Sequence, residues 1–114
     1  MVKTNLETGM RWFVYSSLFA LLSSPAIAQG LEPAAQRGLT IARANCARCH
    51  SIDRVTPSPL AIAPPFRTLH KKYPVENLEE ALAEGISTGH PTMPEFRFEP
   101  DQVNDFIAFL KTLE

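Results

Sequence analysis

Apolar residues recur at helical spacing in three stretches of the chain. The clearest pattern covers residues 100–113, where apolar side chains stand at positions 103, 106, 107, 110 and 113. A proline stands at the first position of each stretch, at residues 33, 74 and 100, and Gly85 follows the second. The pattern therefore predicts helices over residues 33–45, 74–84 and 100–113.

A shorter helix over residues 65–72 also fits the pattern, because Phe66, Leu69 and Tyr73 would share one of its faces. No stretch of useful length alternates between apolar and polar residues, as a half-buried strand does. The expected fold class is therefore all-α, with three to four short helices joined by loops. The 10 prolines of the chain suit a fold with much loop.

The first 28 residues have the order of a secretory signal peptide. Two basic residues and one acidic residue among the first 11 precede an apolar stretch, residues 12–22, and Pro25 separates this stretch from Ala26-Ile27-Ala28. We expect cleavage after Ala28, which leaves a domain of residues 29–114. The alternative is an uncleaved anchor, because no charged residue stands from position 12 to position 31, a length that just spans a bilayer. Both outcomes predict a periplasmic domain, with membrane association only if the segment is retained.

Composition limits the functions that this domain can have. The chain has 11 Lys+Arg and 12 Asp+Glu, a formal net charge of −1 at pH 7, which argues against a strongly basic nucleic-acid binder. A domain of 86 residues, 29–114, buries a modest share of its surface and often needs a disulfide, a metal or a cofactor. The 2 cysteines exclude a dense disulfide framework.

Both cysteines stand in one short motif, Cys46-Ala47-Arg48-Cys49-His50. This is C-x-x-C-H, the attachment motif of a c-type haem. Its two thiols, one turn of chain apart, add to the two vinyl groups of the porphyrin, and the following histidine lies where its imidazole can bind iron. The alternatives are a dithiol redox pair, half of a zinc site and a plain disulfide. The spacing, His50 and the predicted export favour haem.

Met93 is the only methionine after residue 28, and it is the expected second axial ligand. It lies between Pro91 and Pro94, which fix φ and favour a stiff, extended loop. The alternative is that Met93 fills the core. His90, three residues earlier, competes for the ligand position and would give bis-histidine ligation. His70, beside two lysines, is expected to be a solvated surface residue.

The chain resembles the class I cytochrome c family, particularly its small bacterial periplasmic members with one haem. The resemblance covers residues 29–114 and implies the cytochrome c fold, in which helices and loops wrap one covalently bound haem. It implies that Gly38 lets the ring of Phe109 approach where the first and last helices cross. It also implies that the carbonyl of Pro64 accepts a hydrogen bond from Nδ1 of His50, and that the Met93 loop lies on the far side of the haem.

The chain departs from the family at two kinds of position. Ala42 stands where the family often has an aromatic residue, four positions before the first cysteine of the motif. The only tryptophan is Trp12, within the predicted signal peptide, whereas larger members place a tryptophan near a haem propionate. The candidates for propionate partners are therefore Arg67, Tyr73 and Arg97.

These features predict a monohaem c-type cytochrome that carries one electron at a time, as a monomer, between periplasmic or membrane redox proteins. Ligands on both faces of the iron leave no open position for a substrate, so we expect an electron carrier and not an enzyme. The alternatives are a haem subunit tethered to a dehydrogenase or oxidase complex, a haem-based gas or redox sensor, and a haem-free disulfide protein.

Charge is divided unevenly along the predicted domain. Residues 29–72 hold seven basic and two acidic residues, whereas residues 73–114 hold two basic and nine acidic residues. The simpler interpretation is that these are solvated helix faces. The functional interpretation is a dipole that orients the molecule toward redox partners and acts chiefly on encounter rates.

Overall fold

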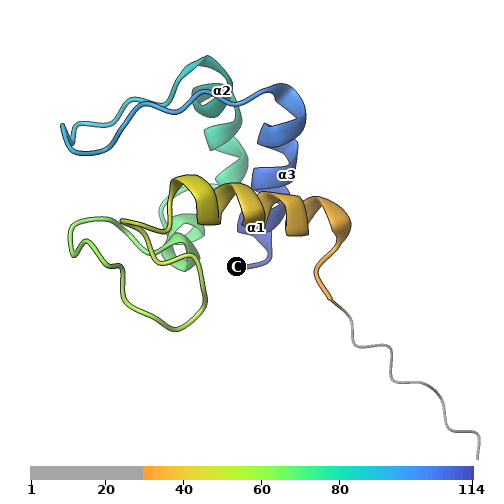
Figure 1. The fold of residues 1–114 in the computed structure, drawn as a ribbon, viewed down its shortest axis with the longest axis horizontal. Helices are drawn as coiled ribbons and strands as arrows, with labels where there is room; N and C mark the ends of the chain where they lie inside the picture. The colour runs from red at the N-terminus through yellow and green to blue at the C-terminus, as the bar shows by residue number, and fades with distance from the viewer. Residues whose placement is uncertain (1–29) are drawn as a thin grey trace, which may run out of the picture.

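The structure is a computed structural model that describes residues 30–114, so the predicted signal segment, residues 1–28, lies outside the described residues (Figure 1). The elements, in chain order, are α1 (Pro33–Asn45), η1 (Phe66–Lys71), η2 (Val75–Asn77), α2 (Leu78–Glu84) and α3 (Pro100–Lys111). Within the described residues, extended pairing is confined to one antiparallel bridge between Ile86 and Phe96. The all-α prediction is confirmed.

The helices start and end close to the predicted positions, with two refinements. The helix predicted over residues 74–84 is a 3₁₀ turn, η2, followed by α2, and α2 ends at Gly85, whose φ of 116° suits glycine. The shorter helix is a 3₁₀ helix, η1, not an α-helix. At the start of α3, Glu99 and Gln102 form a capping box, which fixes the first turn.

The first and last helices cross in contact, and Gly38 makes this possible (Figure 1). A Cβ atom at position 38 would overlap the backbone carbonyl oxygen of Asp105 and lie 2.7 Å from Cβ of Phe109. Only glycine leaves room for the backbone of α3 at this point. The expected close approach of Gly38 and Phe109 is therefore present.

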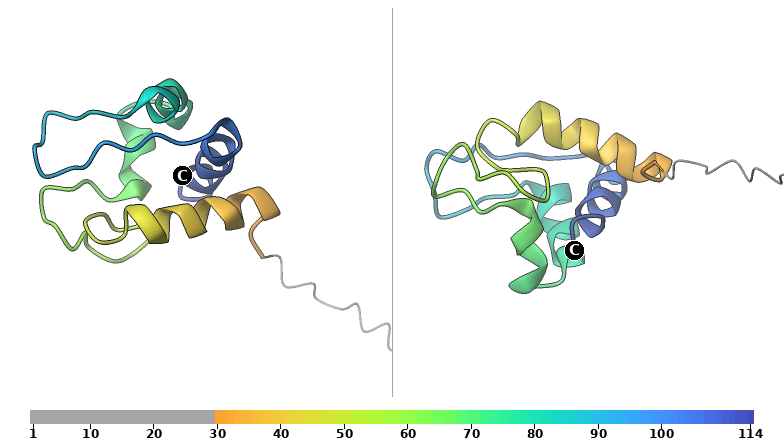
Figure 2. Two further views of the ribbon diagram at one scale, coloured as in Figure 1. Left: turned by 45° about the horizontal axis from the view of Figure 1, so that its top comes forward. Right: turned by 90° about the horizontal axis from the view of Figure 1, so that it is seen from below.

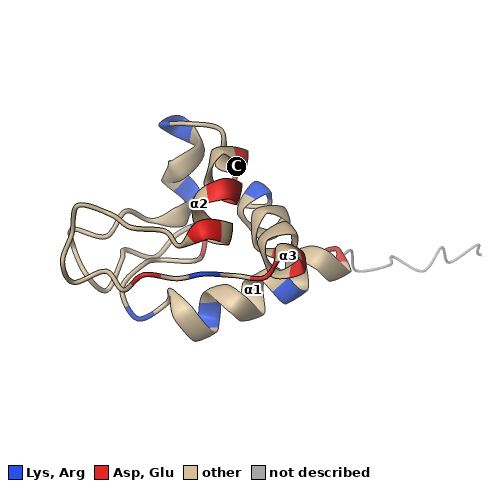
Figure 3. Ribbon diagram, turned by 90° about the horizontal axis from the view of Figure 1, so that it is seen from above, with Lys and Arg blue, Asp and Glu red and all other residues tan. Residues whose placement is uncertain are grey.

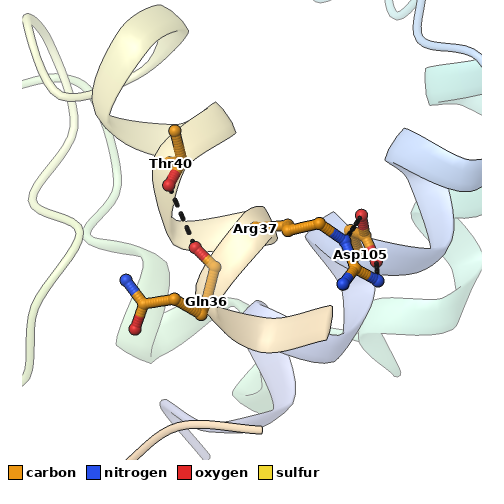
Figure 4. A network of polar contacts seen from close by, with 4 residues as sticks. All are labelled: Gln36, Arg37, Thr40 and Asp105. Atoms are coloured by element: carbon orange, nitrogen blue, oxygen red, sulfur yellow. Dashed lines mark hydrogen bonds and ion pairs between the residues drawn. The ribbon is translucent and has the colours of Figure 1, made fainter. Parts of the chain in front are cut away.

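An ion pair beside this contact joins the same two helices (Figure 4). Nε and Nη2 of Arg37 each donate to one carboxylate oxygen of Asp105, both at 2.7 Å. The hydrogen bond from the guanidinium lowers the pKa of Asp105, although burial of the carboxylate opposes this. Because two parallel bonds fix the relative orientation of the groups, this pair holds α1 at its angle on α3.

The hydrophobic core lies under the crossing and is rich in aromatic rings. Phe106 of α3 is central: its ring lies 5.8 Å from that of Phe66, edge to face, and 5.9 Å from that of Phe98. Edge-to-face and tilted pairs of this kind are favourable beyond the area they bury. The core therefore connects α3 to Phe66, at the start of η1, and to Phe98, which lies two residues before α3.

Two long segments project from the helices toward the same side of the molecule (Figure 2). We call them the 51–65 loop, between the C-x-x-C-H motif and η1, and the 86–98 loop, between α2 and α3. Among residues 30–114, the longest helix is too short and too polar to cross a membrane.

Candidate functional site

A cavity of about 330 Å³ opens between the two loops and reaches down to the aromatic core. Every helical segment except η2 contributes to its wall or its rim. The lining residues include Asn45, Cys46, Cys49, His50, Leu60, Pro64, Phe66, Tyr73, Leu82, Met93, Phe98 and Phe106. The structure thus brings all five residues predicted for the site, Cys46, Cys49, His50, Pro64 and Met93, to one cavity.

The motif is placed by the end of α1. The backbone N–H of Cys46 donates to the carbonyl of Ala42 at 2.8 Å, and the N–H groups of Cys49 and His50 both donate to the carbonyl of Cys46, at 3.1 and 2.9 Å. The helical coiling therefore continues through the motif and puts the two thiols one turn apart along the cavity wall. Both thiols are free, and burial, followed by the neighbouring Cys49, raises the pKa of Cys46 to about 11.

His50 is held by the 51–65 loop. Its Nδ1 lies 2.8 Å from the carbonyl oxygen of Pro64, which is the contact that the family resemblance implies. A carbonyl only accepts, so Nδ1 carries the proton and Nε2 keeps a lone pair free for a metal. The ring also lies against Phe66, with 4.9 Å between centroids, which restricts its rotation.

Met93 reaches the cavity from the 86–98 loop. Its side chain is half-buried, and its backbone N–H closes a turn on the carbonyl of His90 at 3.1 Å. Met93 lies outside the hydrophobic core, so the interpretation as core filler is not supported. His90 also lines the cavity, so both candidates for the second ligand are near it. His70, in contrast, does not line the cavity and is half-buried at the end of η1.

The base of the 86–98 loop is closed by one backbone bond between its two arms and is tied to α2 by two further contacts. The N–H of Ile86 donates to Phe96 at 2.9 Å, and the N–H of Phe98 donates to Leu82 at 2.8 Å. The guanidinium of Arg97 donates to the last carbonyl of α2, that of Glu84, from Nε at 3.1 Å and from Nη2 at 2.8 Å. These bonds give the loop a fixed starting point below the cavity.

Of the three candidates for propionate partners, only Tyr73 lines the cavity. Arg97 is bonded to the end of α2, and Nη1 of Arg67 donates to Ser51, Asp53 and Thr56 of the 51–65 loop. The sequence-based reasoning also missed four polar residues of the lining, Asn45, Lys72, Thr88 and Thr92. Only their closeness in sequence to the motif, to Tyr73 and to Met93 could have indicated them.

The shape and chemistry of this cavity suit a large, flat, apolar group with a metal at its centre. Its floor is formed by aromatic and aliphatic side chains, while an imidazole from the end of the motif and a thioether from the 86–98 loop reach it. Leu60 and Ile62 lie at its mouth, with 38 % and 63 % of their surfaces exposed, so they are not part of the protein core. The residues therefore fit a haem attached through Cys46 and Cys49.

Comparison with protein families agrees with this geometry. The family model of cytochrome c matches residues 35–114, which includes the motif, both loops and α3. Comparisons with curated proteins and with solved structures returned no match. Members of the matched family hold haem c covalently through paired cysteines and are generally electron carriers. Because the match covers well over half of the chain and all elements of the cavity, the chain belongs to the cytochrome c family.

Proposed function

We propose that this chain is a monohaem c-type cytochrome that carries one electron at a time between redox proteins. The observation that carries the proposal is the convergence on one cavity of Cys46, Cys49 and His50, from the end of α1, with Met93, from the distant 86–98 loop. The haem, when bound, supplies reversible one-electron redox chemistry at its iron. The chain's part is to attach the haem, to provide two axial ligands and to exclude water.

In this proposal His50 and Met93 would be the two protein ligands that hold the haem iron. The Pro64 carbonyl holds the tautomer in which Nε2 of His50 is a ligand. A thioether is a weak, uncharged ligand, and its pairing with histidine raises the reduction potential. With both axial positions filled, the site makes no chemical change to a substrate, so the protein acts as a carrier and not as an enzyme.

The partners and the location are also part of the proposal. Residues 1–28 would export the domain to the periplasm, where it would act as a monomer after cleavage. Acidic residues lie on α2 and along the segment that leads into α3, whereas basic residues lie on α1 and before η2 (Figure 3). This separation supports orientation of the molecule toward charged redox partners, an effect that salt would weaken.

The decisive experiment is the optical spectrum of the purified protein, after a haem stain on a denaturing gel. We expect a stained band and, in the ferric state, a sulfur-to-iron charge-transfer band. Met93→Ala should abolish this band, lower the reduction potential and let carbon monoxide bind the ferrous protein. His90→Ala, from the same loop, is the matched control and should leave all three unchanged.

The other outcomes separate the alternatives. An unstained gel would identify a haem-free disulfide protein. A wild-type protein whose potential responds to His90→Ala and not to Met93→Ala would have bis-histidine ligation. Carbon monoxide binding to the unaltered ferrous protein would indicate a sensor, and retention of residues 12–22 in the mature protein, detected by N-terminal sequencing, would indicate a tethered subunit.

A further inference from the structure

The 86–98 loop carries a ligand candidate at its tip but is held chiefly at its base. At the tip, the bonds are one turn contact from Met93 to the carbonyl of His90 and one from the N–H of His90 to the hydroxyl of Thr88, at 3.3 Å. Residues 87–92 are exposed. The position of Met93 in the cavity therefore depends on how firmly the two arms of the loop are fixed where they leave the protein.

The outgoing arm leaves α2 through Gly85, a position at which any other residue would be strained. The φ of Gly85 is 116°, and a Cβ atom at this position would collide with the carboxylate of Glu95 on the returning arm. The two arms are thus in close contact at this point. The bridge between Ile86 and Phe96 continues this contact by one backbone bond.

The returning arm is attached to the end of α2 by a side chain, that of Arg97. The last carbonyls of a helix have no N–H partner within it, and they form the negative end of the helix dipole. Two of the three guanidinium nitrogens, Nε and Nη2, donate to one such carbonyl, that of Glu84. A charged donor at this place is favourable for two reasons, because it satisfies the carbonyl and because its charge opposes the dipole.

We propose that Arg97 is a positioning residue for Met93, which locks the returning arm of the 86–98 loop to the C-terminus of α2. The inference rests on the proposed role of Met93 as a ligand. Arg97 does not line the cavity, so it acts through the backbone of its own loop and not on the haem. Its bond to Glu84 lies between the backbone bonds of Phe96 and Phe98, so its loss loosens both.

The test compares Arg97→Gln with Arg37→Gln in the haem-loaded protein. Both variants remove one positive charge and a guanidinium that makes two hydrogen bonds, but Arg37 joins α1 to α3 and touches neither loop. The first readout is the affinity of imidazole, which displaces Met93 from the ferric iron. We expect this affinity to rise by about three- to tenfold in Arg97→Gln, the scale of the net contribution of an ordinary hydrogen bond, since Arg97 is exposed, and to stay at the wild-type value in Arg37→Gln.

The second readout does not depend on the haem ligand. Amide hydrogen exchange at Ile86 and Phe98 should become faster in Arg97→Gln, while exchange at Phe66, which is bonded to Ser51, stays unchanged. In Arg37→Gln all three amides should respond alike, because the whole fold is weakened. Arg97→Lys retains the charge and one donor, so it should fall between Arg97→Gln and wild type in both readouts.

Unchanged imidazole affinity in Arg97→Gln would overturn the proposal, whether or not the amides exchange faster. If the wild-type ferric protein lacks the sulfur-to-iron band, the ligand role of Met93 fails instead. The positioning claim for Met93 then fails with it, and the exchange data still show whether Arg97 anchors the loop. The two failures are therefore distinguishable.

Discussion

The two loops that flank the cavity are stabilised in different ways. The first half of the 51–65 loop is held together by side-chain hydrogen bonds: the N–H of Ser51 donates to the hydroxyl of Ser58, and Asp53 accepts bonds from the N–H groups of Val55 and Thr56. Arg67 ties these turns to η1. The 86–98 loop is fixed at its base, and its tip relies on prolines.

The difference follows from residue types. Short polar side chains such as serine, threonine and aspartate hydrogen-bond to nearby backbone and build turns from within. The tip of the 86–98 loop has two prolines near Met93, which restrict φ but remove donors, so stiffness there comes from geometry and not from bonds. The site therefore has one proposed ligand, His50, held within a network of hydrogen bonds, and another, Met93, in a loop that is fixed only at its base.

This contrast suits a pair of ligands of unequal strength. The imidazole of His50 is oriented by the carbonyl of Pro64 and the ring of Phe66. The thioether of Met93 has no comparable partner in the described structure, so the iron binding proposed for it would depend on the loop. If both residues bind iron as proposed, we expect destabilising substitutions to weaken the bond from Met93 before the bond from His50.

The largest expected effect comes from a change outside both loops, Gly38→Ala. The added Cβ would overlap the Asp105 carbonyl, so α1 and α3 must separate, and the free energy of unfolding should fall by about 3 kcal/mol. Denaturant unfolding measures this, and amide exchange should rise by the same factor in both loops. If exchange rose by different factors in the two loops, the difference in stability between them would originate at the helix crossing and not in the bonds within each loop.

Gly89→Ala is the matched control for that change. An added Cβ at position 89, in the tip of the 86–98 loop, would meet no atom within 4 Å. Its effect on the free energy of unfolding should lie within about 0.5 kcal/mol, as for other surface substitutions.

A smaller effect is expected from Arg67→Ala, which removes the centre of the 51–65 network. Three acceptors lose their donor: the hydroxyl of Ser51 and the carbonyls of Asp53 and Thr56. The free energy of unfolding should fall by about 2 kcal/mol, because Ser51 is buried and water replaces only some of these bonds. A loss no larger than that of Arg97→Gln, measured under the same conditions, would contradict the stronger bonding of this loop.

The sequence is a good guide to the helices because their signals are local. A proline opens each of the predicted helices, and the first is found at its predicted bounds. The 3₁₀ turns at η1 and η2 were not distinguished from α-helix, because apolar spacing over six or fewer residues fits both. Local signals did not indicate the contacts of Gly38 with α3 and of His50 with Pro64, which were expected only from the family resemblance.

Contacts between distant residues could not be read from local patterns. Arg97 was a candidate for a propionate partner, but it binds a helix end 13 residues earlier, which depends on where the loop returns. Leu60 and Ile62 line the cavity, but their apolar side chains alone do not indicate whether they pack against protein or against a bound group. The convergence of the two loops likewise depends on the packing of α1 on α3.

The smallest expected effect is the pH dependence that Asp53 gives to the 51–65 loop. The Thr56 hydroxyl, and then the N–H groups of Thr56 and Val55, lower the pKa of Asp53 from 3.8 to about 2 in the folded protein. A carboxylate whose folded pKa is depressed stabilises the fold fully above about pH 4, and this contribution disappears as the pH falls to about 2.

Asp53→Asn tests this directly. The wild type should lose stability between pH 5 and pH 2 more steeply than the variant, and the gap between them should close toward pH 2, as measured by urea unfolding at each pH. Asp105 also has a lowered pKa, but it is present in both proteins and its contribution cancels in the difference. Thr56→Val removes the first cause of the shift and should flatten the profile in part. Parallel profiles in all three proteins would mean that the turn at Asp53 does not distinguish this loop from the 86–98 loop.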